Sequence, residues 1–222
     1  MMAKSRRTTE AKPAREEANS SGLRQSIIDA ARQAFNEESY SGLTMRKIAA
    51  RVGCTAGTLY LYFPSKEDLL RHVWEDEFEK LHIYILGAVD QARDPVEKAR
   101  QIFLAWSRYF IQNKEDFRIM YGWHTSSVYR RKEEPGSIFG RSTESYQYFR
   151  GILEEALKSA INAPKNSDAA MQCLLMATFG IVVMTNGPSQ FPWFDPEDMA
   201  ALTIDSIFAG WGVPVGRRKN VG

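Results

Sequence analysis

The chain has 222 residues, of which 44% are hydrophobic and 25% are charged. This composition is typical of a soluble globular protein of one or two domains, and two distant cysteines argue against a disulfide framework and favour a reducing cytoplasm. The net charge of +2 is unevenly divided, because residues 1–72 hold twelve Lys/Arg against eight Asp/Glu while the remainder has a small acidic excess.

The N-terminal segment 1–20 is polar, carries mixed charges and lacks the apolar core of a signal peptide. We expect it to be a disordered tail. The first helix is expected over about 22–38, because apolar residues recur there every four positions. These residues are Leu23, Ile27, Ala31 and Phe35.

Two short helices joined by a glycine turn are expected next, over about 44–63. Thr44 and Thr55 are the expected N-caps, and Gly53 is expected to end the first helix because glycine tolerates a left-handed conformation. Leu59 and Phe63 stand four residues apart and should pack inward. The outward face of the second helix is small and rich in hydroxyls, which suits a DNA major groove. Its residues are Thr55, Ala56, Thr58, Tyr60 and Tyr62.

Gly57 is unusual because a glycine inside a helix costs about 1 kcal/mol relative to alanine. Close approach of a DNA backbone would explain it. The alternative is that Gly57 lies in the first turn of the helix, where glycine is less unfavourable.

Three segments in this region resemble the TetR family of bacterial transcriptional regulators. They read AARQAF at 30–35, TMRKIA at 44–49 and GTLYLYFPSKEDLL at 57–70, and the match covers about 22–72. The resemblance implies that Tyr60, Tyr62 and Lys66 contact DNA. Lys47 departs from the Glu or Gln of a capping box, which affects only the detail of the cap.

We therefore expect a DNA interface in which the second short helix reads the groove and hydroxyl or amine groups bind phosphates. The groove-facing candidates are Thr55, Ala56, Gly57, Thr58 and Tyr60, and the phosphate candidates are Thr44, Tyr62 and Lys66. Arg46 either reaches a phosphate or is a solvated arginine. The second short helix has no Arg, Asn or Gln, so bases would be read through methyl contacts, water or DNA shape.

Helical periodicity continues to the C-terminus without strand-like alternation. A long helix should run from about 66 to 88, capped by Ser65, and further helices should follow after Pro95 and at about 117–128, 142–161, 168–186 and 196–212. The expected fold is all-α with about nine helices. The expected domains are a helix-turn-helix domain at 21–66, a ligand-binding and dimerisation domain at 67–212 and a flexible tail at 213–222.

A single headpiece reads too few bases to be selective, so we expect a homodimer on a two-fold DNA site. The helix at 168–186 has no charge after Asp168, is apolar nearly all round and must be buried on all sides. A partner subunit would cover it, the alternative being a core helix within one chain; the apolar run is short for a membrane span. The expected dimer residues are Leu174, Leu175, Ile181, Val182, Met199, Leu202, Phe208 and Trp211.

The C-terminal part is dense in aromatic residues with polar tips and in methionines, which favours a pocket for a small, largely apolar effector over a plain core. The family resemblance strengthens this expectation. The candidate ligand residues are Trp106, Tyr109, Phe110, Phe117, Met120, Tyr121, His124, Tyr146, Phe149, Met176 and Phe179. For His124 a satisfied core histidine is an equal alternative.

Patterns of catalysis do not occur in the sequence. The three histidines are scattered without zinc spacing, and no phosphate-binding or dinucleotide-binding motif is present. We expect no enzyme activity, metal or cofactor. The expected function is a ligand-responsive repressor of operator DNA in the cytoplasm. The alternatives are an activator of the same family, or a small-molecule carrier or enzyme that retains a helix-turn-helix.

Overall fold

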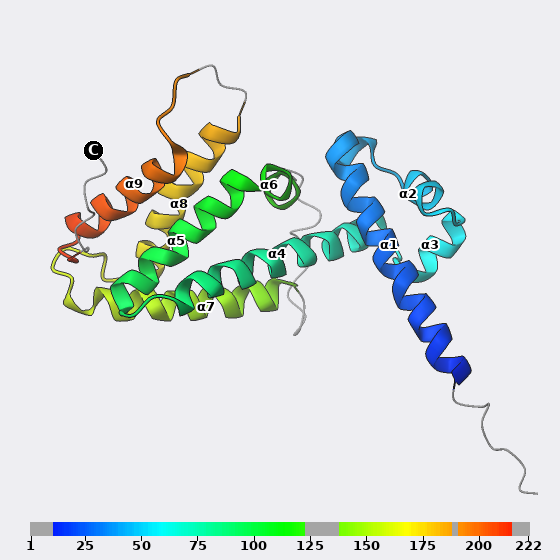
Figure 1. Cartoon of the computed structure of the whole chain (residues 1–222), viewed down its shortest axis with the longest axis horizontal. Coiled ribbons are helices and arrows are strands. Elements are labelled where there is room, and N and C mark those ends of the chain that lie inside the picture. Colours follow the sequence, from blue (N-terminus) through cyan, green and yellow to red (C-terminus); the bar gives the residue numbers. More distant parts are fainter. Residues whose placement is uncertain (1–10, 123–137, 188–190, 215–222) are drawn as a thin grey trace, which may run out of the picture. The chain divides into compact units, whose positions relative to one another are not determined.

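The computed structural model describes residues 11–122, 138–187 and 191–214, and these residues form helices and no strand (Figure 1). The expected all-α fold is confirmed, with nine α-helices and one short 3₁₀ helix in the described residues. The helices are α1 (Ala11–Gly42), α2 (Met45–Val52), α3 (Ala56–Tyr62), α4 (Lys66–Asp90), α5 (Pro95–Gln112), α6 (Lys114–Tyr121), α7 (Ile138–Ala156), η1 (Leu157–Ser159), α8 (Ser167–Asn186) and α9 (Pro196–Gly210).

The chain divides into two compact units, and the division falls inside α4. The N-terminal unit contains the described residues up to Glu75, together with Tyr121 and Gly122. The C-terminal unit contains residues 76–120 and the described residues from 138 onward. Because α4 is one continuous helix, it contributes turns to the core of each unit.

Helix α1 begins earlier than the sequence predicted. It starts at Ala11, so the expected disordered tail is wrong for residues 11–20, while residues 1–10 lie outside the described part of the chain. The added turns contain three alanines and two glutamates, which are strong helix formers. Pro13 lies in the first turn, where its missing N–H has no helical partner to lose.

The two short helices begin and end where the sequence predicted. The Thr44 hydroxyl accepts the N–H of Lys47, and the Thr55 hydroxyl accepts the N–H of Thr58. Gly53 has a φ of 73°, the left-handed conformation that ends α2 and allows the reversal into α3. All three local predictions are confirmed.

The N-terminal unit is built around one small apolar core. Helices α1, α2, α3 and the first turns of α4 each bury residues in it. The buried residues include Ile27, Ala31, Phe35, Met45, Ile48, Leu59, Phe63, Leu69, Leu70 and Val73. This core holds the outer face of α3 in a defined orientation.

The C-terminal unit is organised around α5, which packs against α7, α8 and α9. Two ion pairs fasten α5 to α9. Arg100 donates to both carboxylate oxygens of Asp205, at 2.6 and 3.0 Å, and Arg108 donates to Glu197 at 2.7 Å. The helix expected over 117–128 is α6, which ends at Tyr121, and the expected contributions of His124 and Val128 lie outside the described residues.

Candidate nucleic-acid interface

Helix α3 presents one face to the core and the other to solvent. Leu59 and Phe63 are fully buried, as the spacing predicted, whereas Tyr60 and Leu61 are exposed. The sequence prediction overlooked Leu61, whose side chain is 85% exposed. Leu61 lies two residues from both Leu59 and Phe63, and residues two apart on a helix point to different faces. This spacing could have placed Leu61 on the outer face.

The start of α3 carries a compact pair of hydroxyls. The Thr55 Oγ1 atom lies 3.0 Å from the backbone nitrogen of Thr58 and 2.9 Å from the Thr58 Oγ1 atom. Ala56 is half-buried and Gly57 is exposed in the same turn. A methyl group added at Gly57 would meet only the Thr55 hydroxyl, at 3.6 Å. Packing within the chain therefore does not require a glycine at this position.

Helix α2 supplies three exposed basic residues beside this turn. Lys47 bonds to Glu38 and Arg51 bonds to Glu37, so both basic residues join α2 to the end of α1. The Arg51 hydrogen bond lowers the pKa of the Glu37 carboxyl below its ordinary value. Arg46 is exposed on the same helix.

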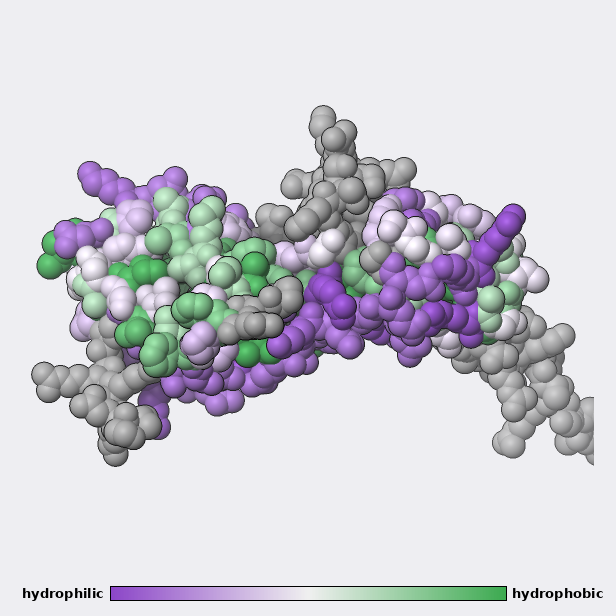
Figure 2. Space-filling model, turned by 90° about the horizontal axis from the view of Figure 1, so that it is seen from above, coloured by the Kyte–Doolittle hydropathy of each residue, from purple (hydrophilic) through white to green (hydrophobic). Residues whose placement is uncertain are grey.

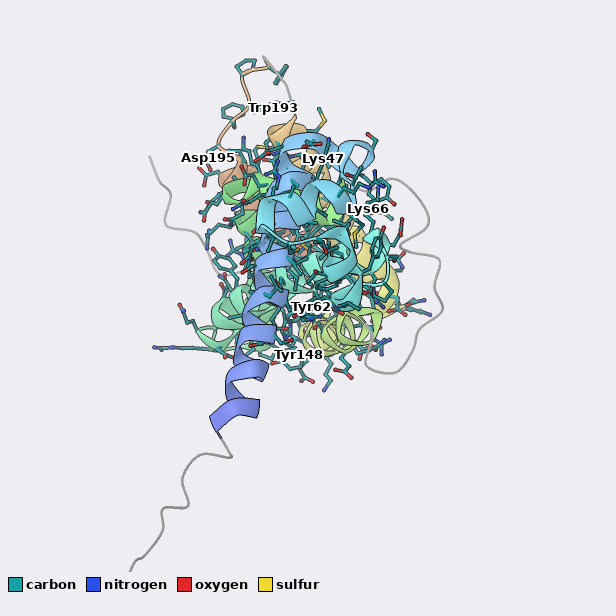
Figure 3. The ribbon with its side chains drawn as sticks, turned by 90° about the vertical axis from the view of Figure 1, so that its right-hand side faces the viewer. Lys47, Tyr62, Lys66, Tyr148, Trp193 and Asp195 are labelled. Carbon is teal, nitrogen blue, oxygen red and sulfur yellow. The ribbon has the colours of Figure 1, made fainter. Side chains whose placement is uncertain are left out.

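Lys66 has a structural role that the sequence did not reveal. Its Nζ atom donates to the carbonyl oxygens of Tyr40 at 3.1 Å and Leu43 at 3.3 Å, and it lies 3.9 Å from the centre of the Tyr40 ring. Tyr62, also labelled in Figure 3, accepts a hydrogen bond from Ser20 at 3.4 Å. Lys66 therefore caps carbonyl groups at the C-terminal end of α1. Its predicted contact with a DNA phosphate stays a prediction.

The first turn of α4 is also rich in hydrogen bonds. The Ser65 hydroxyl accepts the N–H of Asp68 at 3.0 Å, which confirms Ser65 as the cap. Glu67 follows, and its pKa lies below its ordinary value of 4.5, first because its own backbone N–H donates to the carboxylate. The Tyr40 hydroxyl also donates to Glu67, at 3.0 Å.

Helices α8 and α9 leave an apolar face uncovered. Within the described residues α8 is the one helix long and apolar enough to cross a membrane by length and composition, yet only 28% of its most apolar window is buried. Its exposed positions follow helical spacing, and Leu202 is exposed on α9. The exposed residues on α8 are Ala169, Gln172, Cys173, Met176, Gly180, Val183 and Met184. Figure 2 shows the hydrophobic surface that gathers on this face of the C-terminal unit.

The predicted dimer residues divide into two sets. Leu174, Val182 and Phe208 are fully buried within one chain, so they belong to its core. Leu202 is 57% exposed, and four others are half-buried. These four are Leu175, Ile181, Met199 and Trp211. Sequence reasoning missed most of the exposed face because a helix that is apolar all round does not reveal which side its own chain covers.

Five of the eleven predicted ligand residues lie in one aromatic cluster of the C-terminal unit, in which the Tyr109 ring lies 5.3 Å from that of Phe110. Trp106, Phe110, Phe117 and Phe179 form successive ring contacts with centroid distances of 5.0 to 6.1 Å. Trp106, Tyr109, Phe110, Met120 and Phe149 are buried.

Two of the predicted tyrosines have hydroxyl partners within the unit, and the other predicted ligand residues in the described part of the chain lie outside the cluster. The Tyr109 hydroxyl donates to Asp116 and the Tyr146 hydroxyl donates to Asp168, so both polar tips are satisfied within the unit. Met176 is 70% exposed on the apolar face. Tyr121 ends α6 in the N-terminal unit, and His124 lies outside the described residues.

Two cavities lie along α4 in the C-terminal unit, and neither is lined by the predicted ligand residues. The first has a volume of about 480 Å³ and is lined by Ile83, Tyr84, Gly87, Ala88, Gln91, Ala92, Glu97, Gln101 and Arg108. The second has a volume of about 740 Å³ and lies between α4 and α7. Phe78, His82, Leu86 and Asp90 line the second cavity from α4. They are spaced four residues apart, so the sequence already places them on one face of that helix.

Comparison with known proteins gives a family model that matches part of the N-terminal unit and relatives that match about a third of the chain. A family model described as "Bacterial regulatory proteins, tetR family" matches residues 27–73. The fatty acid metabolism regulator protein of Bacillus subtilis (strain 168) is 32% identical over 84 residues, which are 38% of this chain and 42% of that protein. The HTH-type transcriptional repressor KstR of Rhodococcus jostii (strain RHA1) is 35% identical over 79 residues, 36% of each chain.

Solved structures extend the similarity to both units. A TetR family transcription regulator from Marinobacter aquaeolei VT8 has a TM-score of 0.64 and 18% identity, covering 84% of this chain and 97% of that one. The ketosteroid transcriptional regulator KstR2 of Mycobacterium tuberculosis has a TM-score of 0.60 and 17% identity, covering 84% and 93%. Residues 27–73 match the TetR family, and the chain shares the fold of solved TetR-family regulators.

The two kinds of similarity differ in what they cover. In sequence, the chain matches less than half the length of these TetR-family relatives, and in fold it matches nearly the whole of the solved TetR-family chains. The KstR relative is named as an HTH-type transcriptional repressor, and the Marinobacter aquaeolei structure as a TetR family transcription regulator. The α2–turn–α3 segment therefore lies within the residues that the family model matches, while the C-terminal unit shares only the fold of the solved structures.

Proposed function

We propose that this TetR-family protein is a repressor that binds a palindromic operator as a homodimer and is released from the DNA by a small effector. The α2–turn–α3 segment is the single observation that carries the proposal. Its buried side fixes α3 in the core while the threonine pair and Tyr60 remain outside. In this assignment the N-terminal unit is the DNA-binding domain, and the C-terminal unit is the effector-binding and dimerisation domain.

On DNA, α3 would lie in the major groove with Thr55, Ala56, Thr58 and Tyr60 against the bases. Gly57 would allow the DNA backbone to approach the helix closely. The phosphates would be bound by Thr44, Arg46, Tyr62 and Lys66, since hydroxyls and amines are the usual phosphate contacts. Thr44 and Arg46 are exposed, whereas Tyr62 and Lys66 are half-buried.

The dimer would form through the exposed apolar face of α8 and α9. Gly180 on α8 and Ser206, Ala209 and Gly210 on α9 are small and exposed, which permits close approach of helices from a second copy. Burying Met176 and Leu202 there would remove their apolar surface from water. A pair of headpieces would then read two half-sites of the operator.

The effector would act through α4. The last turns of α4 line both described cavities, and its first turns place Leu69, Leu70 and Val73 in the core of the DNA-binding domain. A ligand that prefers one orientation of α4 would shift the population between DNA-competent and released dimers. The names of two relatives, which refer to fatty acid metabolism and to ketosteroids, support a largely apolar effector.

The test starts from the purified full chain and genomic fragments of its source, selected for binding at low ionic strength. Arg46→Ala should lower affinity for the selected fragment and reduce the salt dependence by about one counterion. Lys158→Ala is the matched control, because Lys158 is exposed in the C-terminal unit and should leave both quantities unchanged.

Three outcomes would overturn parts of the proposal. Failure to retain any genomic fragment would favour a small-molecule carrier or enzyme that keeps a helix-turn-helix. Equal loss of affinity in both variants would remove Arg46 from the interface. Increased transcription from the bound promoter would make the protein an activator.

A further inference from the structure

The cavity between α4 and α7 lies outside the predicted ligand cluster. Its volume of about 740 Å³ is within the range of small-molecule sites. Helix α4 contributes five lining residues and α7 contributes three. They are Phe78, Glu79, His82, Leu86 and Asp90 on α4, and Glu144, Ser145 and Tyr148 on α7.

The charge of this cavity has one sign. Glu79, Asp90 and Glu144 bring three exposed carboxylates to its lining, and no lysine or arginine is among its described lining residues. The other cavity along α4 contains both Glu97 and Arg108 and has no such bias. Carboxylates around one cavity repel each other and attract a cation.

Three of the lining side chains carry aromatic rings, namely Phe78, His82 and Tyr148, and Phe149 contacts two of them. The Phe78 and His82 rings are stacked at 6.2 Å, His82 lies 5.6 Å from Phe149, and Phe149 lies 5.5 Å from Tyr148. Tyr148, labelled in Figure 3, is 50% exposed. Aromatic faces bind organic cations through the ring quadrupole and also receive apolar groups.

We propose that the α4–α7 cavity binds an organic cation with an apolar or aromatic body. This inference rests on the proposed function and names the chemical class of its effector. The carboxylates bind the charge, and Phe78, Leu86 and Tyr148 bind the body. The bound molecule would contact α4 from Phe78 to Asp90. The first turns of the same helix lie in the core of the proposed DNA-binding domain.

The test uses two probes of matched shape and opposite charge, tetraphenylphosphonium and tetraphenylborate, titrated into the full-length protein by calorimetry. The cation should bind at least about tenfold more tightly than the anion, and its affinity should fall as salt is added. Equal affinity for the two ions, or tighter binding of the anion, would overturn the inference.

Isosteric variants locate the binding. Asp90→Asn combined with Glu144→Gln should weaken tetraphenylphosphonium by about tenfold, at about threefold for each exposed carboxylate. Tyr148→Ala should weaken the binding of both ions, because it removes one of the aromatic rings that would contact their phenyl groups. Glu155→Gln on α7 is the control, since Glu155 is exposed outside the cavity and should leave the affinity unchanged. Unchanged affinity in the double variant, with an unchanged melting temperature, would place the cation elsewhere and overturn the inference.

Binding to the selected genomic fragment distinguishes this inference from the proposed function. Tetraphenylphosphonium should release the fragment from the wild-type protein and release it less effectively from the double variant. If the fragment binds but the cation does not, the inference fails and the proposed function stands. If the cation binds and no fragment does, the repressor function fails while the cation site stands.

Discussion

Replacing Gly57 by alanine separates the stability of α3 from its contact with DNA. The new methyl group would meet only the Thr55 hydroxyl, at 3.6 Å. Gly57 does not have a positive φ, so alanine should fit at this position without backbone strain. Alanine is favoured in a helix by up to about 1 kcal/mol, and we expect about half of this in the first turn. The melting temperature should therefore rise by about 1–2 °C.

The same methyl group should hinder DNA that approaches α3 closely. We expect a loss of affinity of about tenfold, equivalent to about 1.4 kcal/mol, measured by fluorescence anisotropy on the selected fragment. Gly151→Ala is the matched control, because Gly151 is exposed in the interior of α7 with nothing near its added methyl group. Its melting temperature should rise by about 2–4 °C with unchanged DNA affinity. Unchanged affinity in Gly57→Ala would refute the close-approach explanation and leave the first-turn position as the reason for this glycine.

Three further perturbations test the dimer face, the α5–α9 link and the start of α4. Leu202→Glu places a charge on the apolar face, so light scattering should detect monomers. Ile83→Glu changes an exposed apolar residue on α4 and should leave the dimer intact. Monomers from both variants would contradict the assigned dimer face. Asp205→Asn should lower the free energy of unfolding in urea by about 2 kcal/mol, because it breaks the two-bonded pair with Arg100, and a change below about 0.5 kcal/mol would show that the pair is not stabilising. Glu67 has a lowered pKa in the folded protein, so its stabilisation is present above pH 4.5 and is lost as the pH falls through the folded pKa. Glu67→Gln should therefore flatten the acid limb of stability against pH, and an unchanged acid limb would contradict this role.

Local sequence chemistry was sufficient to predict the helix-turn-helix. Caps and turns depend on a few adjacent atoms, so Thr44, Gly53, Thr55 and Ser65 could be assigned without knowledge of the rest of the fold. Leu59 and Phe63 were predictable as buried for the same reason, because their spacing already defines one face of a helix.

Features that depend on packing between distant segments were not predictable. Lys66 binds carbonyl groups at the end of α1, more than twenty residues earlier, and no local pattern signals that contact. Helix α8 is apolar all round, so its sequence could not separate Leu174 and Val182 inside the chain from Met176 and Met184 outside it. The α4–α7 cavity likewise requires two helices far apart in sequence to lie side by side.

The central claim is that two copies of α3 enter successive major grooves of one operator. Footprinting of the selected genomic fragment, with the mass of the complex measured in parallel, tests this most directly. We predict two protected segments related by two-fold symmetry, with centres one helical turn or a multiple of it apart, about 34–36 Å per turn, and an even number of protein chains for each operator. A single unpaired protected segment occupied by one chain, or no protection at low ionic strength, would contradict the account.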